Sequence, residues 1–169
     1  SWKVGSSWSL TGDAAISGGD AAAMNVWSRA LADSSGRRAS VWQCGNDVCY
    51  SATGETGGAF EVPLAQRILS SPADRQLPAA CFTADGSLFI AWTGAGAKKL
   101  DVFGALLSKR KTLASPASAL NFETGNYQTQ PAAAALPGGR VAVAWTDTRQ
   151  TGDLAIYFNI FSTHSGEIK

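Results

Sequence analysis

Two segments of the chain, at positions 88–92 and 141–145, are wholly apolar and end at a tryptophan. Neither segment carries a charge at its alternate positions. A short apolar run without a polar side is typical of a β-strand that is buried on both faces. We therefore expect each segment to be an interior strand that is covered by protein on both sides.

A longer internal repeat surrounds these strands. Residues 130–145 can be laid over residues 77–92, and a weaker third copy covers residues 27–42. The tryptophans that end the three copies lie roughly 50 residues apart, a spacing typical of repeated supersecondary units that cannot bury their apolar faces alone. We expect Trp42, Trp92 and Trp145 to occupy equivalent buried places.

Each copy is followed, after a polar turn, by another segment with strand character, at positions 47–51, 101–107 and 154–161. Glycine-containing turn signals come next. A unit of the repeat is therefore predicted to be a small strand, a turn, the tryptophan strand, a polar loop, a third strand and a weaker fourth segment. This order describes a four-stranded antiparallel meander.

The first strand of each unit is built from unusually small residues. In the third copy it is a run of four alanines between Pro131 and Pro137. Alanine is the best helix former, so a short helix is the alternative. Small side chains also suit the place where several strands converge near an axis, and this favours the innermost strand of a propeller blade.

The third copy resembles the β-propeller-type repeat of secreted microbial proteins. That repeat has a proline, a Gly-Gly turn, an apolar strand ending in Trp-x-Asp-x-Arg, and then an Asp-Ile-Tyr-like strand; Pro131, Gly138-Gly139, Trp145, Asp147 and Arg149 match it. The second copy has Gly94 where the third has Asp147. The resemblance implies a fold rather than an activity, because such repeats occur in proteins of many functions.

The expected fold class is thus all-β, with three four-stranded antiparallel repeats resembling propeller blades; the alternative is a β-trefoil. The expected units are an N-terminal edge segment at 1–23 and repeats at 24–73, 74–126 and 127–169, the last with an incomplete fourth strand. The segment at 2–17 could supply that strand. Propellers use about four to eight blades. We therefore expect other copies of the chain, or a larger polypeptide, to complete the ring and to be required for a stable fold.

Composition narrows the class of protein. The chain has 169 residues, of which 45% are hydrophobic and 16% charged, and its net charge is +1. These values are typical of a globular domain, and without a basic stripe we expect no nucleic-acid binding. No run approaches the roughly 20 apolar residues that cross a bilayer, so we expect no membrane insertion.

The cysteines indicate the compartment. Cys44 and Cys49 flank a turn-rich insert between two predicted strands, where they could face each other across a hairpin and form a disulfide. Two free thiols are the alternative, and a zinc site lacks further ligands nearby. Cys81 lies in an apolar segment, which is typical of a small buried hydrophobe. One disulfide favours an extracellular or secretory location.

Few residues are candidates for chemistry. Asp147 and Arg149 follow Trp145 at a spacing that allows either a local salt bridge or part of a polar ligand pocket, where Arg149 could bind a carboxylate. Tyr157 and Trp8 are the further candidates for ligand binding. These four residues are the predicted binding set; no catalytic residue, metal ligand or cofactor is predicted.

Two other sets of polar residues favour a structural interpretation. His164 is the single histidine of the sequence and lies in a turn without a nucleophile beside it, which indicates an exposed residue. Asp47, Asp101 and Asp153 recur before the third strand of each unit. They could bind calcium together, but turn capping by their side chains is the favoured role.

These observations predict a non-catalytic extracellular module that binds other polypeptide through its blade edges. The alternatives are a lectin that binds glycans and a hydrolase that processes them, the latter requiring two carboxylates ~5–10 Å apart. Three repeats without an evident acid and base pair favour the first prediction over both alternatives.

Overall fold

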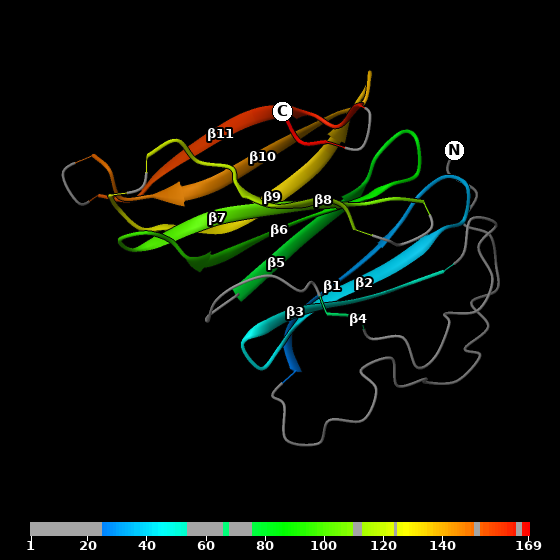
Figure 1. Ribbon diagram of the computed structural model, residues 1–169, viewed down its shortest axis with the longest axis horizontal. Helices are drawn as coiled ribbons and strands as arrows, with labels where there is room; N and C mark the ends of the chain where they lie inside the picture. The colour runs from blue at the N-terminus through cyan, green and yellow to red at the C-terminus, as the bar shows by residue number, and fades with distance from the viewer. Residues whose placement is uncertain are drawn as a thin grey trace, which may run out of the picture.

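The computed structural model describes most of the chain as strands joined by short turns (Figure 1). The described residues are 25–53, 66–67, 76–109, 113–123, 125–150, 153–164 and 167–169. They contain eleven strands, arranged in three separate antiparallel sheets. The all-β class predicted from the sequence is confirmed.

The first two sheets have four strands each, in simple meander order. The strands of the first are β1 (Asn25–Ala32), β2 (Arg38–Cys44), β3 (Asp47–Ala52) and the short β4 (Gln66–Arg67). Those of the second are β5 (Gln76–Phe82), β6 (Leu88–Ala95), β7 (Leu100–Leu107) and β8 (Leu113–Ala119).

The third sheet has three strands among the described residues, in the order β11-β10-β9. They are β9 (Gln128–Leu136), β10 (Arg140–Asp147) and β11 (Ala155–Ser162). The alanine run is part of β9, so the helix alternative is wrong. The segment at 2–17, which could supply a fourth strand, lies outside the described residues.

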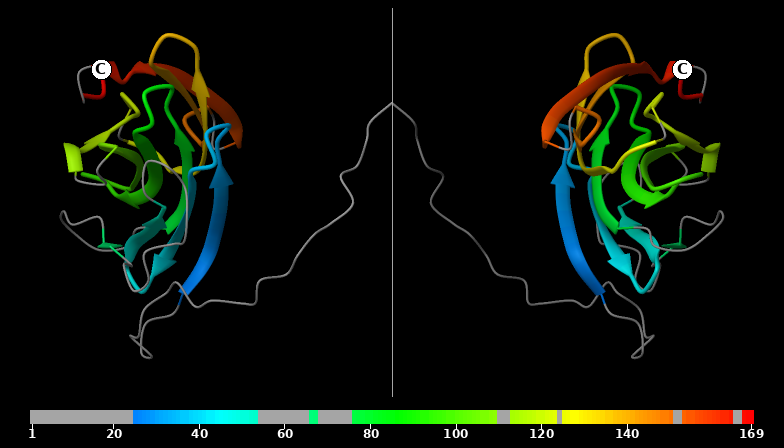
Figure 2. Two further views of the ribbon diagram at one scale, coloured as in Figure 1. Left: turned by 90° about the vertical axis from the view of Figure 1, so that its right-hand side faces the viewer. Right: turned by 90° about the vertical axis from the view of Figure 1, so that its left-hand side faces the viewer.

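The sheets follow one another as a stack in chain order, from the blue-cyan first sheet through the green second to the orange-red third (Figure 2). The first strands of the sheets form the inner row, in which β5 lies beside both β1 and β9. Stacked meanders with an inner row of first strands favour the propeller-like prediction over the β-trefoil.

A glycine turn joins the first two strands of each sheet. Gly36 and Gly86 adopt left-handed φ angles of 84° and 87°, and Gly138 and Gly139 adopt 75° and 62°. Glycine reaches this region without steric cost, which explains its place in the repeat. All three of these turns lie at the same end of the stack (Figure 1).

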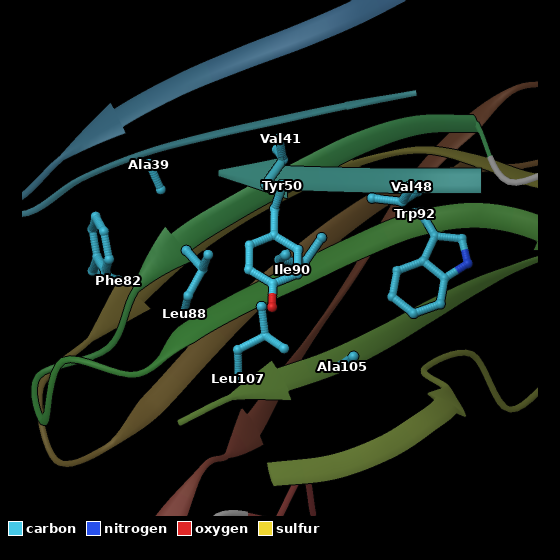
Figure 3. Packing of buried hydrophobic residues seen from close by; sticks show 10 residues of the cluster. All are labelled: Ala39, Val41, Val48, Tyr50, Phe82, Leu88, Ile90, Trp92, Ala105 and Leu107. Carbon is cyan, nitrogen blue, oxygen red and sulfur yellow. The ribbon is translucent and has the colours of Figure 1, made fainter. Parts of the chain in front are cut away.

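The first core layer lies between sheets one and two (Figure 3). Val41 and Tyr50 come from the first sheet, whereas Ile90, Trp92 and Leu107 come from the second, and all are buried. Each such side chain stabilises the fold by about 1.5–3 kcal/mol relative to exposure. This layer therefore holds the first two sheets together.

The second core layer joins sheets two and three. Phe89 and Leu106 on the far side of sheet two pack with Val141, Val143 and Trp145 of β10. Strand β6 is consequently buried on both faces, as its sequence predicts.

Strand β10 departs from that prediction. Val141, Val143 and Trp145 are buried, but Ala142 and Ala144 on the opposite face are partly exposed. The physical reason is that sheet two covers one side of β10, and no described element covers the other. The prediction that both faces of this strand are buried is therefore wrong.

The three tryptophans do lie in equivalent buried places, on the second strand of each sheet. Trp42, Trp92 and Trp145 are all classed among the buried hydrophobic residues. The side chains of Trp92 and Trp145 face the preceding sheet, because they belong to the core layers described above. Trp42 lies on the corresponding face of sheet one, where it clusters with Cys44 and Cys49.

The predicted disulfide between Cys44 and Cys49 is confirmed, with 5.9 Å between the two Cα atoms. It links the two strands of the β2–β3 hairpin, in which Cys44 pairs with Asp47 beside the turn and Cys49 pairs with Trp42. Among the described residues, no helix has the length and apolar character needed to span a membrane.

Candidate functional site

The inner strands define two ends of the stack with different chemistry. At one end lie the glycine turns that leave β1, β5 and β9; at the other end these three strands begin (Figure 1). The polar residues predicted from the sequence gather at the second end, where β10 finishes and β11 starts.

Each inner strand begins with the same irregularity. Trp27, Leu77 and Gln130 are the non-glycine residues with left-handed backbone among the described ones, with φ of 57°, 53° and 55°. The pairing register shifts at each of them, as in a β-bulge. Such a conformation costs about 1–2 kcal/mol per residue, and bulges next to active sites often redirect a side chain.

The bulges leave polar and aromatic side chains near solvent. Trp27 is 56% exposed and Gln130 is also exposed. The backbone N–H of Gln130 donates to the hydroxyl of Thr93 at 3.2 Å, and its side-chain carbonyl accepts from Thr146 at 3.4 Å. These contacts tie the start of β9 to β6 and β10, so the bulge is held from two sides.

Asp147 organises the loop that leaves β10. Its carboxylate is fully buried and accepts hydrogen bonds from the Arg149 backbone N–H at 2.8 Å and from Arg149 Nε at 2.7 Å. Arg149 Nη2 forms an ion pair with the same carboxylate, and the indole N–H of Trp145 donates to it at 3.4 Å. The Arg149 guanidinium also lies 4.0 Å from the Tyr157 ring centre.

Asp147 and Arg149 keep each other charged. Burial would raise the pKa of Asp147, but hydrogen bonds, above all from Arg149, outweigh burial and lower the pKa. The hydrogen bond from Arg149 to Asp147 in turn raises the pKa of Arg149. Both groups are therefore ionised near neutral pH, which suits binding and positioning rather than proton transfer.

A buried amide completes the cluster. Gln128 pairs with Asp147 in the β9–β10 register and has no exposed surface. It lies close enough to Asp147 to contribute to the lowered pKa, yet neither polar atom of its amide reaches hydrogen-bond geometry with another group. Such unsatisfied buried groups are uncommon in folded proteins.

Other carboxylates in the described residues serve turns. Asp33 binds Ser35 and Arg37, Asp85 binds Thr83 and Ser87 in the same way, and the pKa of both carboxyl groups is lowered. A glycosidase acid needs a raised pKa. The lowered pKa values therefore do not favour Asp33 or Asp85 as a general acid.

The opposite end of the stack holds a cavity of about 380 Å³ between the glycine turns. Asp33, Arg37, Phe82, Leu136 and Pro137 contribute to its lining. Arg37 is engaged there, because it pairs with Asp33 and lies 5.5 Å from the Phe82 ring centre. The cavity falls in the size range of small-molecule sites but lacks an unengaged charged group.

The structure brings three of the four predicted binding residues together. Asp147, Arg149 and Tyr157 form one contact cluster, whereas Trp8 lies outside the described residues. Trp27 and Gln128 were missed. Nothing in the sequence indicated Gln128. For Trp27 the only indication was its alignment with Leu77 and Gln130, the first residues of the other two copies.

Two of the three recurrent aspartates, Asp47 and Asp101, occupy equivalent places opposite the second residue after the anchor tryptophan, and Asp153 does not. Asp101 pairs with Gly94 in β6–β7 and binds the Asn121 amide at 2.9 Å, whereas Ala155 has the corresponding place opposite Asp147. Asp153 precedes β11. In the part of the chain that the structure describes, no group of three or more His, Cys, Asp or Glu could hold a metal ion.

Several solved structures have a fold similar to that of this chain. An endo-arabinase of Bacteroides thetaiotaomicron aligns with a TM-score of 0.56 at 17% identity, over 82% of this chain and 56% of the other. A protein of unknown function from Dyadobacter fermentans aligns with a TM-score of 0.58 at 12% identity, over 86% and 54%. An endo-1,4-β-xylanase of Bacteroides thetaiotaomicron gives a TM-score of 0.51 at 11% identity, over 88% and 52%.

The chain spans about half the length of these solved structures. No protein-family model matches the sequence, and no curated protein is significantly similar to it. At such low identity the likeness shows the fold.

Two predictions are corrected by this comparison. The structural neighbours with a stated activity process glycans, so the prediction of a non-catalytic binding or structural module is wrong, and so is the prediction that the chain is not an enzyme. These predictions were wrong because the evident motifs of the sequence belong to the repeat that defines the fold.

Proposed function

We propose that the chain forms part of a propeller enzyme that hydrolyses a polysaccharide. The observation that carries this proposal is the alignment of more than four fifths of the chain with an endo-arabinase and an endo-1,4-β-xylanase. Arabinan and xylan are therefore the first substrates to test.

The end of the stack where β1, β5 and β9 begin is the proposed substrate side. Three bulges converge there, and they offer an exposed indole at Trp27 and an exposed amide at Gln130. Aromatic faces stack on the apolar faces of sugar rings, and amides bind hydroxyl groups. Both groups suit a neutral glycan.

Asp147, Arg149 and Tyr157 are proposed as positioning residues beside this site. The ion pair fixes the loop between β10 and β11, and the guanidinium holds the Tyr157 ring on one face. The donors of Arg149 that do not serve Asp147 are available to sugar hydroxyls, since its side chain is about one quarter exposed.

The reaction itself needs a proton donor and a second carboxylate. Asp33, Asp85 and Asp147 are engaged and have lowered pKa values, so they do not supply this pair. Asp13, Asp20, Glu55, Glu61 and Asp74 lie outside the described residues. In the proposed division of roles, Trp27, Gln130 and Arg149 bind and orient the glycan.

The disulfide suits an extracellular enzyme, because such bonds persist in oxidising compartments. A polysaccharide is too large to enter a cell intact. An extracellular location is therefore part of the proposal.

Affinity electrophoresis in gels containing arabinan or xylan tests the proposal, together with release of reducing ends. We expect retardation in at least one gel and about five- to thirtyfold weaker binding for Trp27→Ala, because loss of a stacked aromatic costs on the order of 1–2 kcal/mol. Phe158→Ala is the matched control, since Phe158 is 72% exposed and lies in the middle of β11, away from the end where the inner strands begin. A protein that neither binds nor cleaves either polymer contradicts the proposed function.

A further inference from the structure

The cavity of about 380 Å³ between the glycine turns lies at the end of the stack opposite the proposed substrate side. All three turns that join the first two strands of a sheet contribute to its lining. We propose that this cavity binds a small organic acid, a carboxylate with an apolar body, through the guanidinium of Arg37.

Arg37 uses only one of the two hydrogen-bonding edges of its guanidinium. Nε donates to the Asp33 carboxylate at 2.5 Å, and Nη2 forms an ion pair with the same oxygen. No group in the part of the chain that the structure describes accepts a hydrogen bond from Nη1. The end edge, formed by Nη1 and the second N–H of Nη2, is therefore free for another acceptor. A carboxylate matches such an edge with two parallel hydrogen bonds.

The position of Arg37 is already fixed without a ligand. Its guanidinium carbon lies 5.5 Å from the Phe82 ring centre. Gly86 lies so close to Nη1 that a Cβ at this position would overlap the guanidinium. The side chain of Arg37 is 15% exposed. A guanidinium that is held in this way loses little conformational freedom on binding, so more of its hydrogen-bond energy contributes to affinity.

Apolar side chains line much of the rest of the cavity. Leu136 and Pro137 come from the β9–β10 turn, and Phe82 comes from the end of β5. Phe82 also lies at the end of the first core layer, beside Leu88 (Figure 3). Walls of this kind favour a hydrocarbon body over a hydrated inorganic anion, and the volume falls in the range of small-molecule sites.

The charges around the cavity favour an anion. The acidic side chains of the three turns, Asp33 and Asp85, are hydrogen-bonded within their own turns. Arg140 adds a positive charge, because its Nε donates to a backbone carbonyl of the lining at 3.1 Å. Lys109 adds another close to Asp85, where its charge contributes to the lowered pKa of that carboxyl group. With Arg37 included, the positive charges among these side chains outnumber the negative ones.

The test is a titration of the full chain with benzoate, followed through the backbone amide shifts in NMR spectra. We expect a dissociation constant of about 1 mM or below, with the largest shifts at Ser34, Thr83 and Leu136. Benzyl alcohol has the ring without the charge, and acetate has the charge without the ring. Each should bind at least about tenfold more weakly than benzoate, because it lacks one of the two recognised groups.

Arg37→Lys keeps the charge but removes the planar fork, so it should weaken benzoate binding by at least about tenfold. Arg29→Gln is the matched control, because Arg29 is exposed within β1 and does not contribute to the lining of the cavity. It should change the affinity for benzoate by less than about twofold. The amide spectra show whether each variant is folded, and the comparison of the three probes needs no variant.

Absence of benzoate binding at about 10 mM would overturn the proposal. Benzyl alcohol binding as tightly as benzoate would show that the acid group is not recognised. Inorganic phosphate binding as tightly would show that the apolar walls do not contribute, and either result also overturns it. So would shifts that gather where β1, β5 and β9 begin. These outcomes are independent of the proposed function, since they involve neither a glycan nor the end of the stack assigned to it.

Discussion

Buried and half-buried aspartates set the shape of the turns in this protein. Asp33 accepts hydrogen bonds from Ser35 and Arg37, and Asp147 does the same with Arg149 in the loop after β10. In both cases a carboxylate satisfies backbone N–H groups that the turn would otherwise leave unpaired. The charge is therefore structural, and its loss should be visible as a pH dependence of stability.

The clearest case is Asp33. Burial opposes ionisation, but hydrogen bonds from Ser35 and Arg37 prevail and lower the pKa of Asp33 to about 2. An unfolded aspartate titrates near 3.9. The stabilisation is thus present above pH ~4 and is lost as the pH falls toward 2.

We expect Asp33→Asn to reduce the difference in unfolding free energy between pH 7 and pH 2 by about 1–2 kcal/mol, the upper value being limited by solvent screening. Urea titrations at both pH values measure it. Glu123→Gln, at an exposed position, should leave the difference unchanged. If Asp33→Asn leaves the difference in unfolding free energy between pH 7 and pH 2 unchanged, the Asp33 carboxylate does not cause the pH dependence of stability.

At the residue scale, the sequence predicts contacts between neighbouring residues better than it predicts which residues are exposed for binding. The two-residue spacing of Asp147 and Arg149 was enough to expect a possible salt bridge. Residues two apart in an extended segment place their side chains on the same side. Trp27 could not be recognised as exposed. Its exposure depends on a left-handed φ, and the corresponding Leu77 and Gln130 precede prolines, which usually favour extended backbone.

The hairpin β2–β3 illustrates the scale of single elements. Its six register pairs run from Ala39–Ala52 to the pair beside the turn, and the disulfide Cys44–Cys49 lies next to that turn. Alternating apolar residues and cysteine spacing predicted this element correctly. Strand β10 was predicted equally well as a strand but wrongly as buried on both faces, since a pattern of residues cannot reveal whether a neighbouring sheet is present.

We expect Cys44→Ser with Cys49→Ser to lower the free energy of unfolding by about 2 kcal/mol, the loop-closure value for so short a ring. Reduction of the original protein should give the same decrease, measured by urea unfolding. Cys81→Ser is the control, because Cys81 is the free cysteine and burial raises the pKa of its thiol to about 12. A double variant as stable as the original would mean that the disulfide does not contribute to the stability of the hairpin.

At the scale of the whole molecule, three meanders are stacked so that the anchor tryptophans of the second and third sheets face the preceding sheet. The order of the meanders followed from the repeat, because no unit can bury its own apolar side. The function did not follow, since the motifs of the repeat specify packing. The glycan-processing role remains a proposal, and its support is the likeness in fold to an endo-arabinase and an endo-1,4-β-xylanase.

The most direct test is a crystal structure of the protein soaked with arabino- and xylo-oligosaccharides. The account predicts a sugar at the end where β1, β5 and β9 begin, with one ring stacked on Trp27 and a hydroxyl bound to Gln130. A sugar bound instead in the cavity between the glycine turns, beside Arg37 and Phe82, would contradict the assignment of the substrate side.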